Sequence, residues 1–147
     1  MFKKILSLCI SMIPIQFIKQ FFYYILFRYR FGKNVKIGIN IICCKHFECE
    51  NNVVIGNFNI FENCVRVYIG KETVIKRHNK FYGIKELLIG QNTAISYKNK
   101  FICNFRLTNY GNLYIGNNVV FVRNHFIDLI DNVSIGNNVV FAGQNSE

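Results

Sequence analysis

The three histidines are the side chains best suited to moving a proton near neutral pH, and each has different neighbours. His125 lies in the stretch Arg123–Asp131, which also holds Asp128 and Asp131. A histidine can serve as general base toward a hydroxyl, and a nearby acid can orient its ring. His125 and Asp128 are three residues apart, so they should point to opposite faces of a straight strand. Two interpretations stay open: a base, or a corner histidine with no catalytic role.

His46 stands close to three further metal-ligand types, Glu48, Cys49 and Glu50. Neighbouring residues of a strand point to opposite faces, so these four side chains should not converge on one ion, and no metal site is predicted. The six cysteines form no C-x-x-C pair and no zinc-ligand spacing. We interpret most of them as small core residues of a protein in a reducing cytosol.

His78 belongs to a basic stretch, Lys76–Lys80, that is either a solvated turn or a phosphate contact for a donor or a lipid head group. The chain carries a formal net charge of +10, which indicates an anionic partner. An anionic membrane, a phosphorylated lipid-linked sugar and coenzyme A all fit this charge. Nucleic acid is not expected as a partner, because the sequence has no base-reading motif and no dense Lys/Arg run.

A repeated Ile-Gly step must position these side chains, because six of the ten glycines directly follow an isoleucine. The six are Gly38, Gly56, Gly70, Gly90, Gly116 and Gly136. Apolar and polar residues alternate around each step, which predicts short strands with one buried face. The inward positions expected after each isoleucine are Ile41/Cys43, Asn59/Phe61, Thr73/Ile75, Thr93/Ile95, Val119/Phe121 and Val139/Phe141. Glycine, and the asparagine that often follows it, should form the corners because both tolerate positive φ.

The spacing of these glycines is uneven, which predicts small insertions and deletions at the corners of an irregular repeat. The widest interval contains Ser96–Tyr110, which we expect to be a protruding loop carrying Lys98, Lys100 and Arg106. Loops on rigid solenoids often carry specificity.

The repeat resembles the hexapeptide-repeat acyltransferases over roughly residues 32–147. The resemblance implies an all-β fold, a left-handed parallel β-helix with three short faces in each coil. It also implies a homotrimer, acetyl-CoA as acyl donor and a sugar hydroxyl as acceptor, in surface polysaccharide or lipopolysaccharide biosynthesis. The acceptor would be a saccharide or a lipid-linked saccharide.

The same resemblance, closest to saccharide O-acetyltransferases, suggests site residues. Asn124, Ile127 and Asp128 match an Asn-x-x-Ile-Asp pattern that faces the acceptor, and Asn145 is a further substrate-binding candidate with a structural role as its alternative. In these relatives the catalytic histidine follows a stretch like Phe141–Glu147 by a few residues, so it is expected beyond Glu147. His125 is then the candidate substitute base. The alternatives are a truncated, inactive remnant of such an enzyme, or a non-catalytic solenoid with a binding or structural role.

Residues 1–31 form a separate segment that contains no acid and is expected to be helical, ahead of the β-helix of residues 32–147. Its longest uncharged run, Ile5–Ile18, is shorter than the roughly 20 residues that a membrane-spanning helix needs. Pro14 should divide the segment into two helices. In the second, an apolar face comprising Ile18, Phe22, Ile25, Leu26 and Tyr29 is predicted. The segment should either lie on an anionic membrane surface or cap the first coil, or do both, in a cytoplasmic protein that is peripheral on the inner membrane if the first holds.

Overall fold

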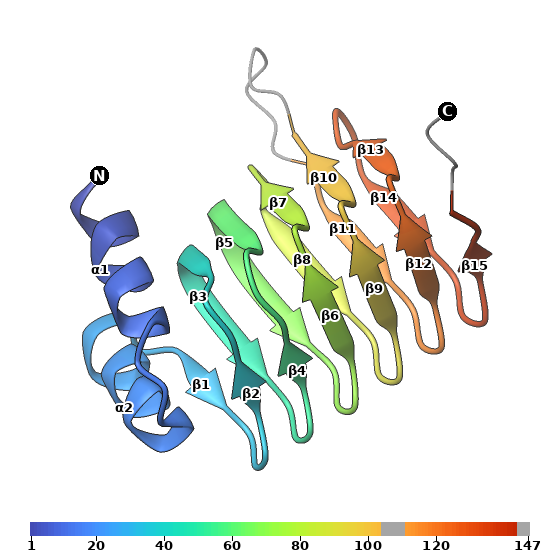
Figure 1. Ribbon diagram of the computed structural model, residues 1–147. Helices are drawn as coiled ribbons and strands as arrows, with labels where there is room; N and C mark the ends of the chain where they lie inside the picture. The colour runs from blue at the N-terminus through green and yellow to red at the C-terminus, as the bar shows by residue number, and fades with distance from the viewer. Residues whose placement is uncertain (104–110, 144–147) are drawn as a thin grey trace.

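The computed structural model describes residues 1–103 and 111–143, which form two helices followed by a stack of parallel β coils (Figure 1). Helix α1 comprises Phe2–Ser11 and helix α2 comprises Gln16–Phe27. The strands are β1 (Arg30–Phe31), β2 (Lys36–Ile37), β3 (Ile41–Cys49), β4 (Val54–Ile55), β5 (Ile60–Ile69), β6 (Val74–Arg77), β7 (Lys80–Tyr82), β8 (Glu86–Ile89), β9 (Ala94–Tyr97), β10 (Lys100–Ile102), β11 (Leu113–Ile115), β12 (Val120–Arg123), β13 (Phe126–Asp128), β14 (Val133–Ile135) and β15 (Val140–Phe141).

The strands wind into a β-solenoid of about five turns in which every ladder is parallel. One face is a six-stranded sheet in the order β15-β12-β9-β6-β4-β2. The other faces belong to one nine-stranded sheet, because β3 and β5 each run around a corner. Beyond β5 this sheet divides into a row of β7, β10 and β13 and a row of β8, β11 and β14. The predicted parallel β-helix with an N-terminal helical segment is confirmed.

The core is a column of apolar side chains in which aromatic rings stack from coil to coil. Phe61 and Phe81 have ring centroids 4.6 Å apart, and Phe81 and Phe101 are 5.0 Å apart. Most of the predicted inward positions are buried, including Thr73, Thr93 and Val119. The predicted pair Ile41/Cys43 is wrong, since Ile42 and Cys44 are buried instead. Asn40 occupies the inward corner of this coil and shifts the alternation by one residue.

The interval between Gly56 and Gly70, the shortest in the repeat, is not a deletion. Ile55 lies in β4 of the six-stranded sheet, whereas Ile69 ends β5 in the nine-stranded sheet. The residue that stacks on Ile55 in the next coil is Ile75. The Ile-Gly step therefore marks two different corners of the solenoid.

At five of the six Ile-Gly corners glycine is required by close packing of backbones rather than by positive φ; the exception is Gly136, where a Cβ would meet nothing within 4 Å. A Cβ on Gly70 would lie 2.6 Å from the carbonyl carbon of Gly90 in the next coil. The left-handed conformation falls two residues later, for example at Glu72 and Asn92 with φ of 59° and 54°. Asparagine is frequent there because it adopts this conformation at lower cost than most residues.

The predicted loop Ser96–Tyr110 is corrected at its start. Ser96 and Tyr97 belong to β9, and Lys100–Ile102 is β10, paired in register with β7. Arg106 lies outside the described residues. The regular coil therefore continues to Ile102, and Lys98 sits at a solenoid corner.

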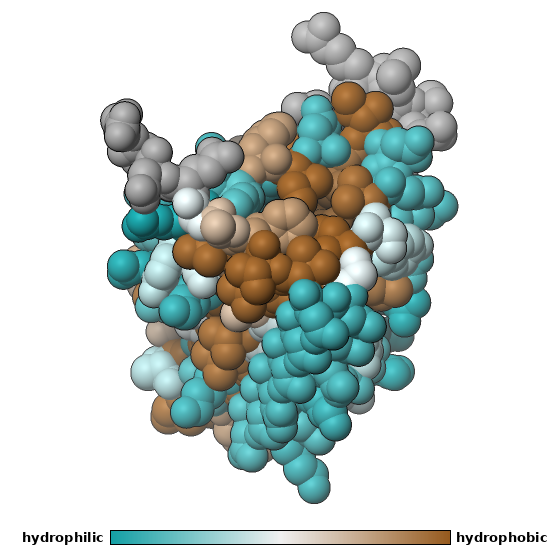
Figure 2. Space-filling model, turned by 90° about the vertical axis from the view of Figure 1, so that its right-hand side faces the viewer, coloured by the Kyte–Doolittle hydropathy of each residue, from teal (hydrophilic) through white to brown (hydrophobic). Residues whose placement is uncertain are grey.

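The end of the solenoid at β13–β15 displays apolar side chains. In Figure 2, which faces this end, apolar residues gather at the centre and hydrophilic residues surround them. Ile127, Val139 and Phe141 are partly buried against the core here. At the opposite end α1 and α2 cover the first coil (Figure 1). Neither helix, nor any other among the described residues, is long and apolar enough to cross a membrane.

Candidate functional site: a basic groove at one corner of the solenoid

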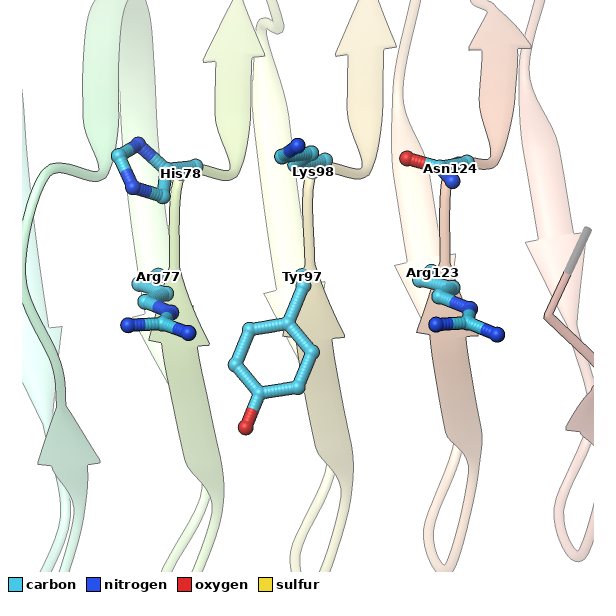
Figure 3. Close-up of a pocket in the computed structure, with 6 residues that line it drawn as sticks. All are labelled: Arg77, His78, Tyr97, Lys98, Arg123 and Asn124. Atoms are coloured by element: carbon cyan, nitrogen blue, oxygen red, sulfur yellow. The ribbon is translucent and has the colours of Figure 1, made fainter. Parts of the chain in front are cut away.

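One groove of about 630 Å³ runs across three successive coils where the six-stranded sheet ends. Each coil contributes a strand-end residue and the corner residue that follows it (Figure 3). The six residues are Arg77 and His78, Tyr97 and Lys98, and Arg123 and Asn124. The parallel register stacks Arg77, Tyr97 and Arg123, so the groove repeats at the spacing of neighbouring strands, about 4.8 Å.

The corner residues adopt the left-handed conformation, which aligns their side chains along the upper rim in Figure 3. His78, Lys98 and Asn124 have φ of 59°, 55° and 59°. Their backbone N–H groups donate to the preceding coil, as from Lys98 to the Arg77 carbonyl at 3.3 Å and from Asn124 to the Tyr97 carbonyl at 3.1 Å. This geometry recurs at the corner and is part of the architecture rather than local strain.

A buried asparagine column directly inside the rim holds this corner in place. The backbone N–H of Asn79 donates to Asn59 Oδ1 at 3.0 Å, and that of Asn99 donates to Asn79 Oδ1 at 3.0 Å. Asn59 is bound in the same way to Asn40 at 2.8 Å. Each inward amide thus fixes the residue that follows His78 or Lys98 on the rim.

The groove is positively charged. None of the described side chains that line it is acidic, while Arg77, Lys98 and Arg123 bring three cations. Tyr97 separates the arginines, and its ring centroid lies 5.2 Å from Cζ of Arg77 and 5.0 Å from Nζ of Lys76. The ion pairs Lys4–Glu62 and Arg66–Glu86 do not involve Arg77 or Lys98. Such a surface suits phosphate groups or another anion.

His78 supplies the groove with a proton acceptor. Its side chain is exposed, and its ring stacks on Phe58 of the preceding coil with centroids 5.4 Å apart and planes 21° apart. In Figure 3 the His78 ring extends toward the preceding coil, on the side away from Lys98. An imidazole held this way can accept a proton from a hydroxyl bound in the groove.

His125 lies at the next rung of the asparagine column instead of in the groove. Its backbone N–H donates to Asn99 Oδ1 at 3.1 Å, and its Nε2 is 3.2 Å from the carbonyl oxygen of Phe141. The ring meets Phe121 and Phe141 edge-on, both at 5.9 Å. Since a carbonyl oxygen only accepts, Nε2 must carry the proton in this contact.

The other predicted substrate-binding residues are dispersed. Asn124 lines the groove, whereas Asp128 is exposed at the end of β13 and is not among the lining residues. Asn145 lies outside the described residues. The structure therefore brings Asn124 together with His78, not with His125.

Sequence reasoning flagged His78 and Asn124 but missed Tyr97 and Lys98 as partners, because these two were placed in a loop. Because the intervals between the glycines are uneven, the sequence reasoning did not align these positions across the coils. Counting from the residues that stack on Ile55, which are Ile75 and Ile95, would have placed Arg77 and Tyr97 at equivalent positions.

Comparisons with protein-family models, curated proteins and solved structures found no match for this chain. Within residues 1–103 and 111–143, no group of three or more His, Cys, Asp or Glu side chains could hold a metal ion. The site is therefore interpreted from its own geometry and charge.

Proposed function

We propose that this protein transfers an acyl group, acetyl in the simplest case, from an acyl-CoA to a sugar hydroxyl, and that the basic groove binds the phosphates of the donor. The observation that carries the proposal is the cation set of the groove, Arg77, Lys98 and Arg123, presented by three successive coils around an exposed histidine. The parallel β-helix and the resemblance of its repeat to hexapeptide acyltransferases give further support. The acceptor class is a saccharide of surface polysaccharide or lipopolysaccharide biosynthesis.

In the proposed reaction His78 is the general base. Its imidazole takes the proton from the acceptor hydroxyl as the oxygen attacks the thioester carbonyl carbon. The carbon–sulfur bond then breaks, and the leaving thiolate takes the proton back from the imidazolium, giving the sugar ester and free coenzyme A.

We assign the base to His78 and not to His125 because the two rings have different contacts. The Nε2 of His125 faces the Phe141 carbonyl, and its ring lies between two phenylalanines. His78 is exposed at the groove. A base must reach the substrate proton, and His78 meets this requirement more directly.

A thiol-release assay with acetyl-CoA and a panel of saccharides tests the reaction. We expect His78→Ala to reduce turnover by roughly 100-fold or more, the usual size of a general-base contribution. His125→Asn keeps an amide on the next rung of the column and should leave turnover nearly unchanged. Equal turnover of His78→Ala and wild type would remove His78 from the reaction.

Calorimetric titration with coenzyme A tests donor binding separately from chemistry. Arg77→Ala and Lys98→Ala should each weaken binding, whereas Lys45→Ala, an exposed lysine on another face, serves as the matched control. Affinity that is the same in all three variants and wild type would contradict binding in the groove.

A second candidate function is a non-catalytic solenoid that binds a phosphorylated saccharide in the same groove. It is favoured by the absence of an acid among the described lining residues, which leaves His78 without a carboxylate to orient it. Saturable binding of a phosphorylated saccharide that depends on Arg77, without any thiol release, would support this alternative over acyl transfer.

A further inference from the structure

Helix α2 turns its polar side toward the protein. Gln16 and Lys19 both donate to the Ile37 carbonyl, and Gln16 Oε1 accepts the Ile37 N–H at 2.9 Å. Gln20 donates to the Val35 carbonyl at 2.7 Å. Polar side chains of a surface helix usually face solvent, so this arrangement is inverted.

The inversion has a physical cause at the first coil. A terminal coil exposes backbone N–H and C=O groups that no neighbouring coil pairs. Side chains of the helical segment pair them here: the Ile42 N–H donates to Ser7 Oγ at 2.9 Å, and the Cys44 N–H donates to the Tyr29 hydroxyl at 3.0 Å. The polar side chains that form these hydrogen bonds therefore face the first coil rather than solvent.

The opposite side of α2 is left entirely apolar or aromatic. Every exposed residue of the helix belongs to this set: Phe17, Ile18, Phe21, Phe22, Tyr24, Ile25 and Leu26. Phe17 is 79% exposed and Tyr24 is 62% exposed, so no part of the chain that the structure describes covers them. Phe2 and Ile5 of α1, with Met12 and Ile15 between the helices, extend the exposed apolar surface at the same end of the solenoid.

The charged side chains of the helical segment are all positive, and the Glu62 carboxylate of the solenoid pairs with Lys4 of α1. The first acid of the chain is Glu48, whereas Lys3, Arg28, Arg30 and Lys33 are exposed before it. Two copies meeting through this surface would bring like charges together, which disfavours a self-contact. An anionic lipid bilayer supplies both an apolar interior and phosphates, and so matches both properties.

We propose that α1 and α2 form a docking surface for an anionic lipid bilayer, lying in its interface while α2 holds the first coil through its polar side. This proposal does not depend on acyl transfer. It extends the cap and membrane alternatives predicted from the sequence into one arrangement, because opposite sides of the same helix serve the two roles. Neither helix is long and apolar enough to cross the bilayer.

Flotation of the full chain with phosphatidylcholine vesicles, with and without phosphatidylglycerol, tests the proposal. We expect flotation with both kinds of vesicle, and markedly stronger flotation with phosphatidylglycerol. The triple variant Phe17→Ser/Phe21→Ser/Ile25→Ser removes three outward side chains and should lower the partition coefficient roughly 100-fold. Since all three are exposed, its far-ultraviolet circular dichroism should match wild type.

The matched control is Phe126→Ser/Ile130→Ser, which removes two exposed apolar side chains far from the cap and should float like wild type. Equal flotation of the triple variant and wild type would overturn the proposal, as would equal binding to neutral and anionic vesicles. A self-association that the triple variant abolishes, with no vesicle binding by wild type, would instead assign this surface to a second copy.

Discussion

Four buried asparagines and one histidine share a single column at one corner of this solenoid. Asn40, Asn59, Asn79 and Asn99 each bond to the next coil, and His125 continues the column at its far end. A buried amide is stable only where its donors and acceptors are paired. Asn40, Asn59 and Asn79 each accept from the asparagine of the next coil, and Asn99 accepts from the backbone N–H of His125, so the column selects one register for the coils.

Because the amides of the column pair with one another, removing a central amide should strongly destabilise the folded protein. Asn79 Nδ2 donates to Asn59 Oδ1 at 3.1 Å and to the Ser96 carbonyl at 2.9 Å, while its Oδ1 accepts from Asn99. Asn79→Ala leaves several buried groups unpaired and should lower the free energy of unfolding by about 2–4 kcal/mol. Urea denaturation measures this loss.

The matched control is Asn132→Ala, an exposed asparagine with a hydrogen bond to the Asn112 N–H, which should cost less than about 1 kcal/mol. An Asn79→Ala variant as stable as this control would mean that the column adds nothing to stability.

At the scale of elements, the helical cap predicts a loss of stability in alkaline solution. Burial is the main cause that raises the pKa of Tyr23 to about 12, and burial likewise raises the pKa of Tyr29. The folded state keeps these protons longer than the unfolded chain, whose tyrosines titrate near 10. Their stabilisation is therefore complete below pH 10 and declines as the pH rises from about 10 to about 12.

Circular dichroism at alkaline pH, compared between Tyr23→Phe and wild type, checks this prediction. The variant should show a smaller fall in thermal midpoint over that range, and exposed Tyr24→Phe should fall as wild type does. Burial lowers the pKa of Lys19, so its own contribution rises with pH toward 10.5. Lys19 is present in all three proteins, so the difference between them isolates Tyr23. Parallel curves would contradict the prediction.

Much of the fold follows from the sequence because apolar alternation fixes which residues face inward. The two helices divided by Pro14, the parallel coils and the buried Phe61 and Phe121 were all predicted. The sequence did not predict which corner of the solenoid each Ile-Gly step occupies, because the same step occurs at two different corners. Tyr29 was placed on the apolar helical face, but Arg28 ends α2 with φ of 58° and Tyr29 turns inward.

The candidate site was predicted only in part, for a related reason. A groove formed by equivalent residues of successive coils depends on register, and register depends on buried contacts such as Asn79 with Asn99. His78 and Asn124 could be recognised as candidate binding residues from their residue types and sequence neighbours. That Lys98 stands between them required the three-dimensional alignment.

At the scale of the whole molecule, the coils form a one-dimensional stack in which each depends on its neighbours. Phe81 is fully buried between Phe61 and Phe101 at the middle of the stack. Phe81→Ala should lower the free energy of unfolding by about 3–5 kcal/mol, as one coil cannot be lost without exposing two others. Exposed Phe126→Ala should change it by no more than about 0.5 kcal/mol. Calorimetry that shows only local melting in Phe81→Ala would contradict this coupling.

The molecule carries two basic surfaces at separate places, and they should respond differently to salt. We propose that the groove near Arg77 binds its ligand mainly by charge, whereas the cap near Phe17 adds an apolar contact with lipid. Raising sodium chloride from 0.15 M to 1 M shortens the screening length from about 8 Å to about 3 Å. Coenzyme A affinity should then fall roughly tenfold or more, while flotation with anionic vesicles falls much less, because burial of apolar surface does not weaken with salt. Titration and flotation at both salt concentrations measure the two effects. In Phe17→Ser/Phe21→Ser/Ile25→Ser the apolar contact with lipid is smaller, so its residual flotation should be more salt-sensitive than that of wild type. Wild-type flotation that disappears in parallel with coenzyme A binding would mean that charge alone, and not the outward apolar side of α2, holds the protein on the bilayer.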